Sequence, residues 1–424
     1  MFLVAGGAGD NSEFGGGQVK ILYVSDTWQS LNQVLYEGAE EMNGMPAFVL
    51  VLKRLLAGGH DVSMILYDYR KANATRVYDI RSTWFSKVHV LDHVYVGAAS
   101  GLRKVVYLWP AWFRIQRAVD KALKAGGYDF VYGQGPLSEA ANAAARRHGV
   151  PFGQRRYGDS TWTLAQLKGT LYAKVSHMPE SLSFRGRKEF MVATQDGSGV
   201  DKALRLFFRD GKPPYAFYHW LNGYPAYESL GPDPQMPQFT TPYLLYVARV
   251  ETWKRQTMAV RVVKALRDRG VSVHLYYAGQ VIEPEYLAEI EHLAARLGVG
   301  DLVHYVGIFQ NRFMGHYAQR ALACLSMYEM CNLGNVFIET FASGAVTVSL
   351  DDGSLDGVVV NGENGFLVKD VDAAAAVIGR LLADSDLRER VQAAARASAR
   401  ADFLPWNERA DREIGLIESC VGRR

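Results

Sequence analysis

Short apolar runs alternate with helical patterns along most of the chain. The residues 19–26 are almost continuously apolar, which is typical of a strand buried on both faces of a parallel sheet. A helix is expected from Pro46 up to Gly58, because proline suits a first helical turn and glycine a helix stop. The stretch 60–67 then reads as the next strand. These three segments predict one β-α-β unit.

The same alternation continues to the C-terminus. Further strands are expected at 87–94, 128–135, 150–158, 189–195, 215–223, 242–249, 273–279, 302–307, 321–327, 346–350 and 365–370. Helices are expected at 110–124, 137–149, 257–270, 285–298, near His316, at 335–343 and twice more near the C-terminus. In the helix 257–270 the apolar residues share one face, which indicates a buried side.

Two successive series of this kind imply an α/β protein with two doubly wound, Rossmann-like domains. We expect a flexible leader at 1–18, a first domain at 19–222, a linker at 223–241 and a second domain at 242–405. The linker is placed where proline and glycine are frequent. Ligands of such sheets bind at the carboxyl ends of the strands, so a cleft between the domains is the expected site.

Composition narrows the class of protein. Hydrophobic residues make up 49% and charged residues 21%, and the net charge of +3 is too small to indicate nucleic-acid binding. Three cysteines without a CxxC pair predict neither a disulfide framework nor a zinc site. No apolar run approaches the ~20 residues of a membrane span, and the leader lacks the features of a signal peptide. We therefore expect a cytoplasmic protein.

Two basic residues follow the first expected strand of the second half. Arg249 comes directly after that strand, and Lys254 lies in the loop before the next helix. Two fixed cations at this edge of a sheet suit a diphosphate, because they neutralise its charge and stabilise it as a leaving group. A solvated basic loop explains this fragment alone equally well.

A glycine and an acid lie at a later helix start. Gly334 lets the backbone turn closely, and Asn335 is expected to cap a helix whose N-terminus suits an anion. Glu339 lies just over one turn further on, where its carboxylate could accept hydrogen bonds from two vicinal ribose hydroxyls. Taken singly, an acid that favours the helix dipole is the simpler explanation.

Together these residues resemble glycosyltransferase family 4, the retaining enzymes with the GT-B fold. The motifs that match in the second half are Ala248-Arg249 with Lys254, Ala278-Gly279, Tyr305-Val306-Gly307, and Gly334-Asn335-Val336 with Glu339. The first half matches more loosely, at Asn43-Gly44, 59–62 and 220–223. The resemblance covers about 19–406 and is most specific in the second half.

The resemblance implies an acceptor-binding first domain and a second domain that binds a nucleotide-sugar donor. Arg249 and Lys254 would be the catalytic cations. The donor would contact Gly44, Gly279, Val306, Gly307, Ile308, Glu329, Cys331, Asn332, Leu333, Gly334, Asn335, Val336 and Glu339. The final helix, at 406–424, would cross back and pack on the first domain.

The sequence departs from the family pattern between the two motifs of the second half. Cys331 stands eight positions before Glu339, where the family usually has its first glutamate. Glu329 lies two residues earlier, in a context that also resembles the family. Either Glu329 takes that role through a longer loop, or the role is lost. In the family this acid contacts the donor sugar, so the identity of the sugar stays open.

Acceptor-binding candidates lie in the first half, at the loop after the strand 150–158. The family often has a histidine where this chain has Tyr157. Arg156 and Asp159 are the polar candidates beside it. Salt bridges or loop caps explain each of them equally well.

The resemblance further implies retention at the anomeric carbon, a front-face mechanism, and neither metal nor cofactor. A uridine diphosphate sugar is the favoured donor and a guanosine diphosphate sugar the next. The acceptor would be a glycan, a small metabolite or a lipid-linked sugar. There are two alternatives. One is a sugar-nucleotide epimerase of the same fold, and the other is a non-catalytic relic of the transferase fold that only binds nucleotide sugars.

Aromatic and basic residues are concentrated at 102–117, in the long helical stretch of the first half. A membrane-surface role would suit them. The spacing of Val106, Trp109, Trp112 and Phe113 equally fits a core-facing helix. We expect the core position.

Overall fold

The structure is a computed structural model. It describes residues 17–422 apart from 43, 72, 98–100, 159–174, 176, 209, 226–230 and 309.

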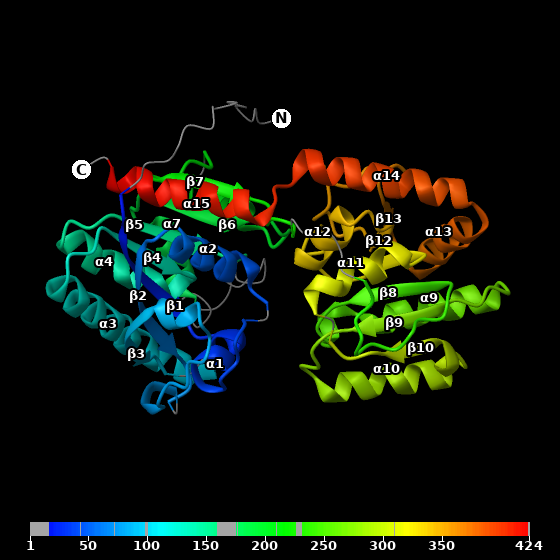
Figure 1. The fold of residues 1–424 in the computed structure, drawn as a ribbon, viewed down its shortest axis with the longest axis horizontal. Coiled ribbons are helices and arrows are strands. Elements are labelled where there is room, and N and C mark those ends of the chain that lie inside the picture. The colour runs from blue at the N-terminus through cyan, green and yellow to red at the C-terminus, as the bar shows by residue number, and fades with distance from the viewer. Residues whose placement is uncertain are drawn as a thin grey trace. The chain divides into compact units, whose positions relative to one another are not determined.

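The first of two parallel sheets has seven strands in the order β3-β2-β1-β4-β5-β6-β7 (Figure 1). They are β1 (Lys20–Asp26), β2 (Asp61–Asp68), β3 (His89–Tyr95), β4 (Phe130–Gln134), β5 (Phe152–Arg156), β6 (Phe190–Thr194) and β7 (Ala216–Trp220). The chain builds outward from β1 to β3, then returns to β4 and builds the other way. The sheet is therefore doubly wound, with its topological switch point between β1 and β4.

Helices follow the strands of this sheet, three of them at segments where the sequence predicts a helix and three at segments where none was expected. They are α1 (Gln29–Tyr36), α2 (Pro46–Ala57), α3 (Gly101–Ala125), α4 (Glu139–Arg147), α7 (Met178–Arg185) and α8 (Val200–Phe207). Helix α3 begins nine residues before the expected Pro110, which lies inside it. Its Trp112 is buried, but Val106, Trp109 and Phe113 are exposed. The expectation that all four face the core is therefore wrong for three of them.

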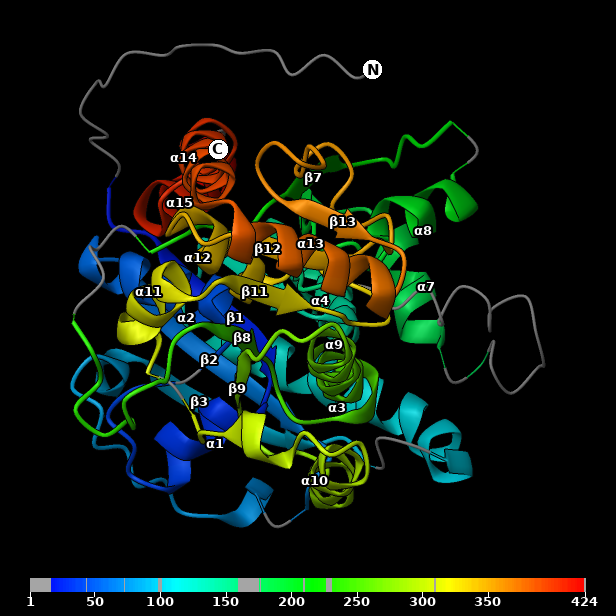
Figure 2. The same cartoon turned by 90° about the vertical axis from the view of Figure 1, so that its right-hand side faces the viewer.

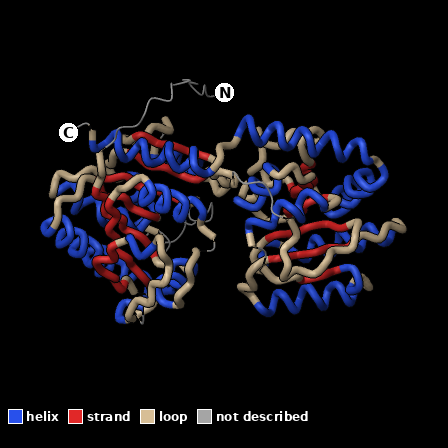
Figure 3. The backbone as a smooth tube through the Cα atoms, in the orientation of Figure 1, coloured by secondary structure: helices blue, strands red, loops and turns tan. Residues whose placement is uncertain are grey.

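The second sheet has six strands in the order β10-β9-β8-β11-β12-β13. They are β8 (Tyr243–Val247), β9 (His274–Ala278), β10 (Val303–Tyr305), β11 (Ala323–Ser326), β12 (Thr347–Leu350) and β13 (Phe366–Val368). Helices flank its strands (Figure 3). Its helices are α9 (Gln256–Asp268), α10 (Pro284–Arg296), α11 (Asn311–Arg320), α12 (Asn335–Ala342), α13 (Val371–Ala383) and α14 (Ser385–Asp402). Helices α9 and α13 pack against each other beside the sheet (Figure 2). The switch point of this sheet lies between β8 and β11.

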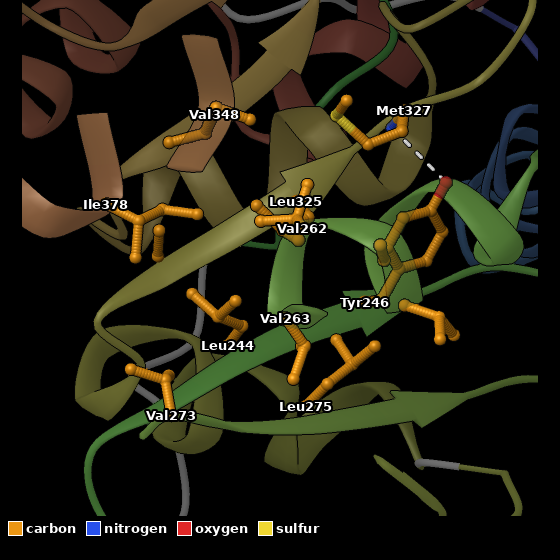
Figure 4. Packing of buried hydrophobic residues seen from close by; sticks show 14 of the residues in the cluster. Leu244, Tyr246, Val262, Val263, Val273, Leu275, Leu325, Met327, Val348 and Ile378 are labelled. Atoms are coloured by element: carbon orange, nitrogen blue, oxygen red, sulfur yellow. Dashed lines mark hydrogen bonds between the residues drawn. The ribbon is translucent and has the colours of Figure 1, made fainter. Parts of the chain in front are cut away.

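The core of the second sheet forms where β-branched and leucine side chains of the strands meet one face of α9. Leu244, Leu275 and Leu325 project from three neighbouring strands toward Val262 and Val263 of the helix (Figure 4). All five are at most 4% exposed. The expected apolar face of this helix is thus confirmed, and its burial fixes the loop that precedes it.

The last helix, α15 (Trp406–Val421), is held by a buried charge network. Glu413 accepts a hydrogen bond from Arg155 of β5 at 2.9 Å and another from Arg409 at 3.1 Å. All three side chains are at most 3% exposed. A buried charge is stable only when it is paired, so these contacts fix α15 against β5.

Contacts between Cα atoms divide the chain into two compact units. One comprises Met1–Gly44, Leu52–Gly153 and Ile414–Arg424, and the other Met45–Val51 and Gln154–Glu413. This division does not test the boundaries expected at 222, 242 and 405, which stay a prediction.

Candidate active site

The predicted donor residues gather at the carboxyl ends of the strands beside the switch point of the second sheet. Arg249 and Lys254 follow β8, and Glu329 to Glu339 follow β11. The two strands are hydrogen-bonded neighbours. Residues that are 75 or more positions apart in the sequence are thus brought to one edge. This is where ligands of open α/β sheets bind.

Gly279 allows two backbone segments to approach closely at this edge. Its φ is +150°, and a Cβ atom there would lie 1.8 Å from the carbonyl oxygen of Ala248. Its N–H donates to the carbonyl of Gly307 at 2.8 Å. Ala248 itself does not have a positive φ, so the alanine is tolerated where the family usually has glycine.

The segment after β10 presents backbone rather than polar side chains. Gly307 has a φ of +79°, and nothing lies within 4 Å of where its Cβ would be. Ile308 is exposed, whereas the Val306 N–H is used in a hydrogen bond to Tyr277. The open space beside Gly307 suits a flat group that lies against the main chain. In the first unit, Gly44 likewise has a positive φ of +85° and open space beside it.

Lys254 lies between two aromatic rings. Its Nζ is 3.7 Å from the ring centroid of Trp253 and 3.7 Å from that of Tyr328. The Tyr328 hydroxyl donates to the Val247 carbonyl at 2.9 Å, which anchors that ring to the end of β8. We call these two rings and the lysine the aromatic cage.

The aromatic cage changes the acidity of the ammonium group. Loss of hydration, followed by repulsion from Arg249, lowers the pKa of Lys254 to about 7, while Glu251 opposes the shift. The attraction of a cation to two rings, about 0.5–2 kcal/mol each, favours the charged form but does not replace the lost water. The site therefore holds a lysine whose charge depends on what binds beside it.

Arg249 is the more accessible cation. Its side chain is 55% exposed, and its Nη2 lies 2.8 Å from the Glu251 carboxylate. The carbonyl of Arg249 accepts a hydrogen bond from Gln256 at 2.8 Å, which fixes the main chain at the start of α9. The main chain of Arg249 is thus fixed, while its exposed guanidinium pairs with the Glu251 carboxylate at the site.

The loop between β11 and α12 is shaped from within by Asn332. This side chain is fully buried and bonds with Ser326 at 2.7 Å and with the main chain of Tyr328. Its own N–H donates to Asp352, and the N–H of Leu333 donates to Ser354. Asn332 and Leu333, which were expected to contact a donor, instead use these groups to hold the loop.

Glu329 and Cys331 occupy different positions on this loop. Glu329 is exposed, and its N–H donates to the Trp253 carbonyl at 3.1 Å. Cys331 is partly buried with a positive φ of +61°, and burial raises the pKa of its thiol to about 12. Glu329 and Cys331 are therefore two different candidates for the role of the family's first glutamate. Of the two side chains, only the carboxylate of Glu329 carries a charge.

Helix α12 begins with uncapped N–H groups. Its N-cap is Gly334, which has no side chain to cap it, so the expected cap Asn335 is instead the first helical residue. Val336 lines a small cavity together with Val247 and Tyr328. The N–H groups of a first turn without a side-chain cap suit an anion at this end of the helix.

Glu339 carries an unused carboxyl group. Within the described residues, no hydrogen bond or ion pair of this carboxyl is found. Its side chain is only partly exposed, and burial raises its pKa to about 8. An acid without a protein partner, close to an anion site, is suited to ligand hydroxyls.

Of the acceptor candidates of the first half, Arg156 has a structural position. Arg156 is 1% exposed, donates to Ser183 at 3.0 Å, and packs 4.4 Å from the Phe184 ring centroid. Its expected role in acceptor binding is replaced by a structural one. Tyr157 is partly exposed, and Asp159 lies outside the described residues.

Sequence reasoning did not identify Trp253, Tyr328, Asp352 or Ser354. Trp253 directly precedes Lys254 in the sequence, and Tyr328 directly precedes Glu329. These two adjacent positions could have indicated that the aromatic residues belong to the site. The two loop-holding residues carry no local signal, because only the fold brings them to the loop after β11.

The two sheets define a fold that solved structures share. Sucrose-phosphate synthase from Thermosynechococcus elongatus superposes with a TM-score of 0.68 at 17% identity, covering 96% of this chain and 100% of that chain. Anabaena HepE in complex with UDP-glucose superposes with a TM-score of 0.61 at 13% identity, covering 94% and 100%. The protein has the GT-B fold of glycosyltransferases.

Sequence comparison matches part of the chain to a known family. Residues 235–398 match the family model described as Glycosyl transferases group 1. A D-inositol 3-phosphate glycosyltransferase from Nocardiopsis dassonvillei is 26% identical over 75% of this chain and 76% of its own. A GDP-mannose-dependent phosphatidylinositol monomannoside mannosyltransferase from Mycolicibacterium smegmatis is 30% identical over 43% of this chain and 48% of its own. This protein is therefore a glycosyltransferase, and its residues 235–398 form a group 1 domain.

Proposed function

We propose that the protein transfers a sugar from a nucleotide-diphosphate sugar to an acceptor hydroxyl, with retention at the anomeric carbon and without a metal ion. The observation that carries this proposal is the position of two cations and an uncapped helix start beside an unpaired carboxyl. Arg249, Lys254 and the first turn of α12 serve the diphosphate. Glu339 serves the ribose hydroxyls.

The mechanism follows from where the charge develops. When the bond between the anomeric carbon and the phosphate oxygen breaks, negative charge accumulates on the leaving diphosphate. Arg249 and protonated Lys254 stabilise that charge in the transition state more than in the ground state. The acceptor oxygen attacks on the same face, and its proton passes to the leaving phosphate oxygen. No side-chain base is needed in this course.

A uridine diphosphate sugar is the favoured donor and a guanosine diphosphate sugar the second. The open backbone at Gly307 and Ile308 would receive the base. Anabaena HepE has been solved with UDP-glucose, and the Mycolicibacterium smegmatis relative is named as GDP-mannose-dependent. The relatives' names also make a phosphorylated inositol, free or in a lipid, the first acceptor class to examine.

The test is release of nucleoside diphosphate from UDP-glucose, UDP-N-acetylglucosamine and GDP-mannose, with and without inositol phosphate or phosphatidylinositol. Lys254→Ala and Arg249→Ala should each reduce turnover by about 100-fold or more, because each removes a charge aimed at the leaving group. Lys264→Ala is the matched control, since this half-exposed lysine on α9 pairs with Asp268.

Turnover in the Lys254→Ala variant that equals wild type would refute the role given to the aromatic cage. Nuclear magnetic resonance of the product decides retention by its anomeric coupling. An epimer of the donor that forms without any acceptor would replace the transferase by an epimerase.

A further inference from the structure

Helix α3 leaves three large apolar side chains in water on one face. Val106, Trp109 and Phe113 are 72%, 46% and 53% exposed, whereas Trp112 and Ile115 of the same helix are buried. Their spacing of three and four residues places them one above the other. The rings of Trp109 and Phe113 have centroids 6.4 Å apart and planes inclined by 29°. We call these three residues the α3 patch.

The same face continues into a row of cations. Arg117, Lys121 and Lys124 follow Phe113 at intervals of four, four and three residues, and all are exposed. Asp120 lies beside them, but its carboxylate is bound by Arg147 of α4 at 2.6 Å. The acid therefore does not cancel the row. Helix α3, which packs against α4 (Figure 1), thus carries an apolar half and a basic half on one stripe.

These features suit an anionic lipid surface better than a protein. Tryptophan favours the interface between water and hydrocarbon, and lysine and arginine near it attract anionic headgroups. A second copy of α3 would offer the same cations, without free acids to complement them. No helix of the described residues is long and apolar enough to span a bilayer, so any contact with a membrane would be made by a surface.

We propose that the α3 patch docks the protein on an anionic bilayer. Trp109 and Phe113 enter the headgroup region, and Arg117, Lys121 and Lys124 lie over the lipid phosphates. This docking goes beyond the proposed sugar transfer and requires neither donor nor acceptor. An experiment can therefore refute the docking without refuting the proposed sugar transfer, and it can refute the transfer without refuting the docking.

The experiment is flotation of the full chain with vesicles of phosphatidylcholine that contain about 30% phosphatidylglycerol as the anionic lipid. The protein should float with these vesicles at low salt and remain behind with pure phosphatidylcholine. The double variant Trp109→Ser with Phe113→Ser should bind at least about tenfold more weakly, because it loses most of the apolar contact.

A triple variant tests the basic half. Replacing Arg117, Lys121 and Lys124 by glutamine should weaken binding by about 100-fold at low ionic strength, at about fivefold for each cation. The matched control replaces three exposed arginines of the other unit by glutamine, which removes the same net charge. They are Arg296, Arg390 and Arg400.

All replaced side chains are exposed or half-exposed, so the melting temperatures should stay near that of the wild type. No binding to anionic vesicles would overturn the proposal, and so would equal loss in the control triple variant. A dimer in light scattering that the double variant abolishes, in protein that binds no vesicles, would assign the α3 patch to a second copy instead.

Discussion

Binding of a nucleotide sugar should be accompanied by protonation of Lys254. In the free protein, loss of hydration holds the pKa of this lysine at about 7, against an ordinary value of 10.5. At pH 7 about half of the molecules therefore carry a neutral amine at the aromatic cage. A bound diphosphate brings negative charges to the ammonium, which raises its pKa again.

The magnitude follows from these two states. Uptake should be about half a proton per site at pH 7 and about one at pH 9, provided that the pKa of Lys254 in the complex exceeds about 10. The protonated fraction of the free lysine falls from about one half to about one hundredth between these pH values. The dissociation constant of the donor should therefore rise by about 50-fold.

The sign for stability is the opposite of the usual one for lysine. Because the folded pKa is depressed, the unfolded chain binds more protons between pH 7 and 10.5. The stability of the free protein contributed by this group therefore rises with pH across that window. Donor binding should weaken this trend, because it raises the pKa of Lys254 in the folded state.

The assay is isothermal titration calorimetry with a nucleotide sugar, in two buffers of different ionisation enthalpy, at pH 7 and pH 9. The diphosphate of such a donor is fully ionised over this range and takes up no proton. Lys254→Arg keeps a permanent charge and should show neither proton uptake nor a pH-dependent affinity. Lys264→Arg should behave as wild type. No proton uptake at either pH, with a constant dissociation constant, would refute the reasoning.

Three further predictions concern the scaffold of the site. Glu413→Ala should lower the free energy of unfolding by about 3–5 kcal/mol in urea titration, because Arg155 and Arg409 would be left buried without their anion; a loss below about 1 kcal/mol would contradict the buried network. Gly279→Ala should destabilise the protein and abolish donor binding in a thermal-shift assay, since its Cβ would collide with the Ala248 carbonyl, and an unchanged melting temperature would count against it. Glu339→Gln should match wild type in melting temperature at pH 5 and exceed it at pH 9. Burial raises the pKa of this acid to about 8, so its contribution to stability is present below about pH 4.5 and lost as pH rises through 8; identical pH profiles would refute this.

Local sequence patterns predicted most elements of both sheets. The helix start at Pro46 and its end before Gly58 need only the preferences of those residues, and α2 has these limits. The start of α3 was missed because proline normally begins a helix, whereas Pro110 lies inside one. The exposed side of α3 was also missed, because an apolar spacing of three and four is the same on a core face and on a surface patch.

The sequence by itself determined the alternation of strands and helices, the two series of them, and the motifs with Arg249, Lys254 and Glu339. These features depend on the preferences and the spacing of residues that are close together in the sequence, so the sequence alone indicates them. Only the tertiary structure decided that Trp253 and Tyr328 enclose Lys254, that the Asn332 side chain hydrogen-bonds within its own loop, and that Arg156 is buried. Each of these depends on which distant segments meet and on how much water remains between them, and that is fixed by packing rather than by local spacing.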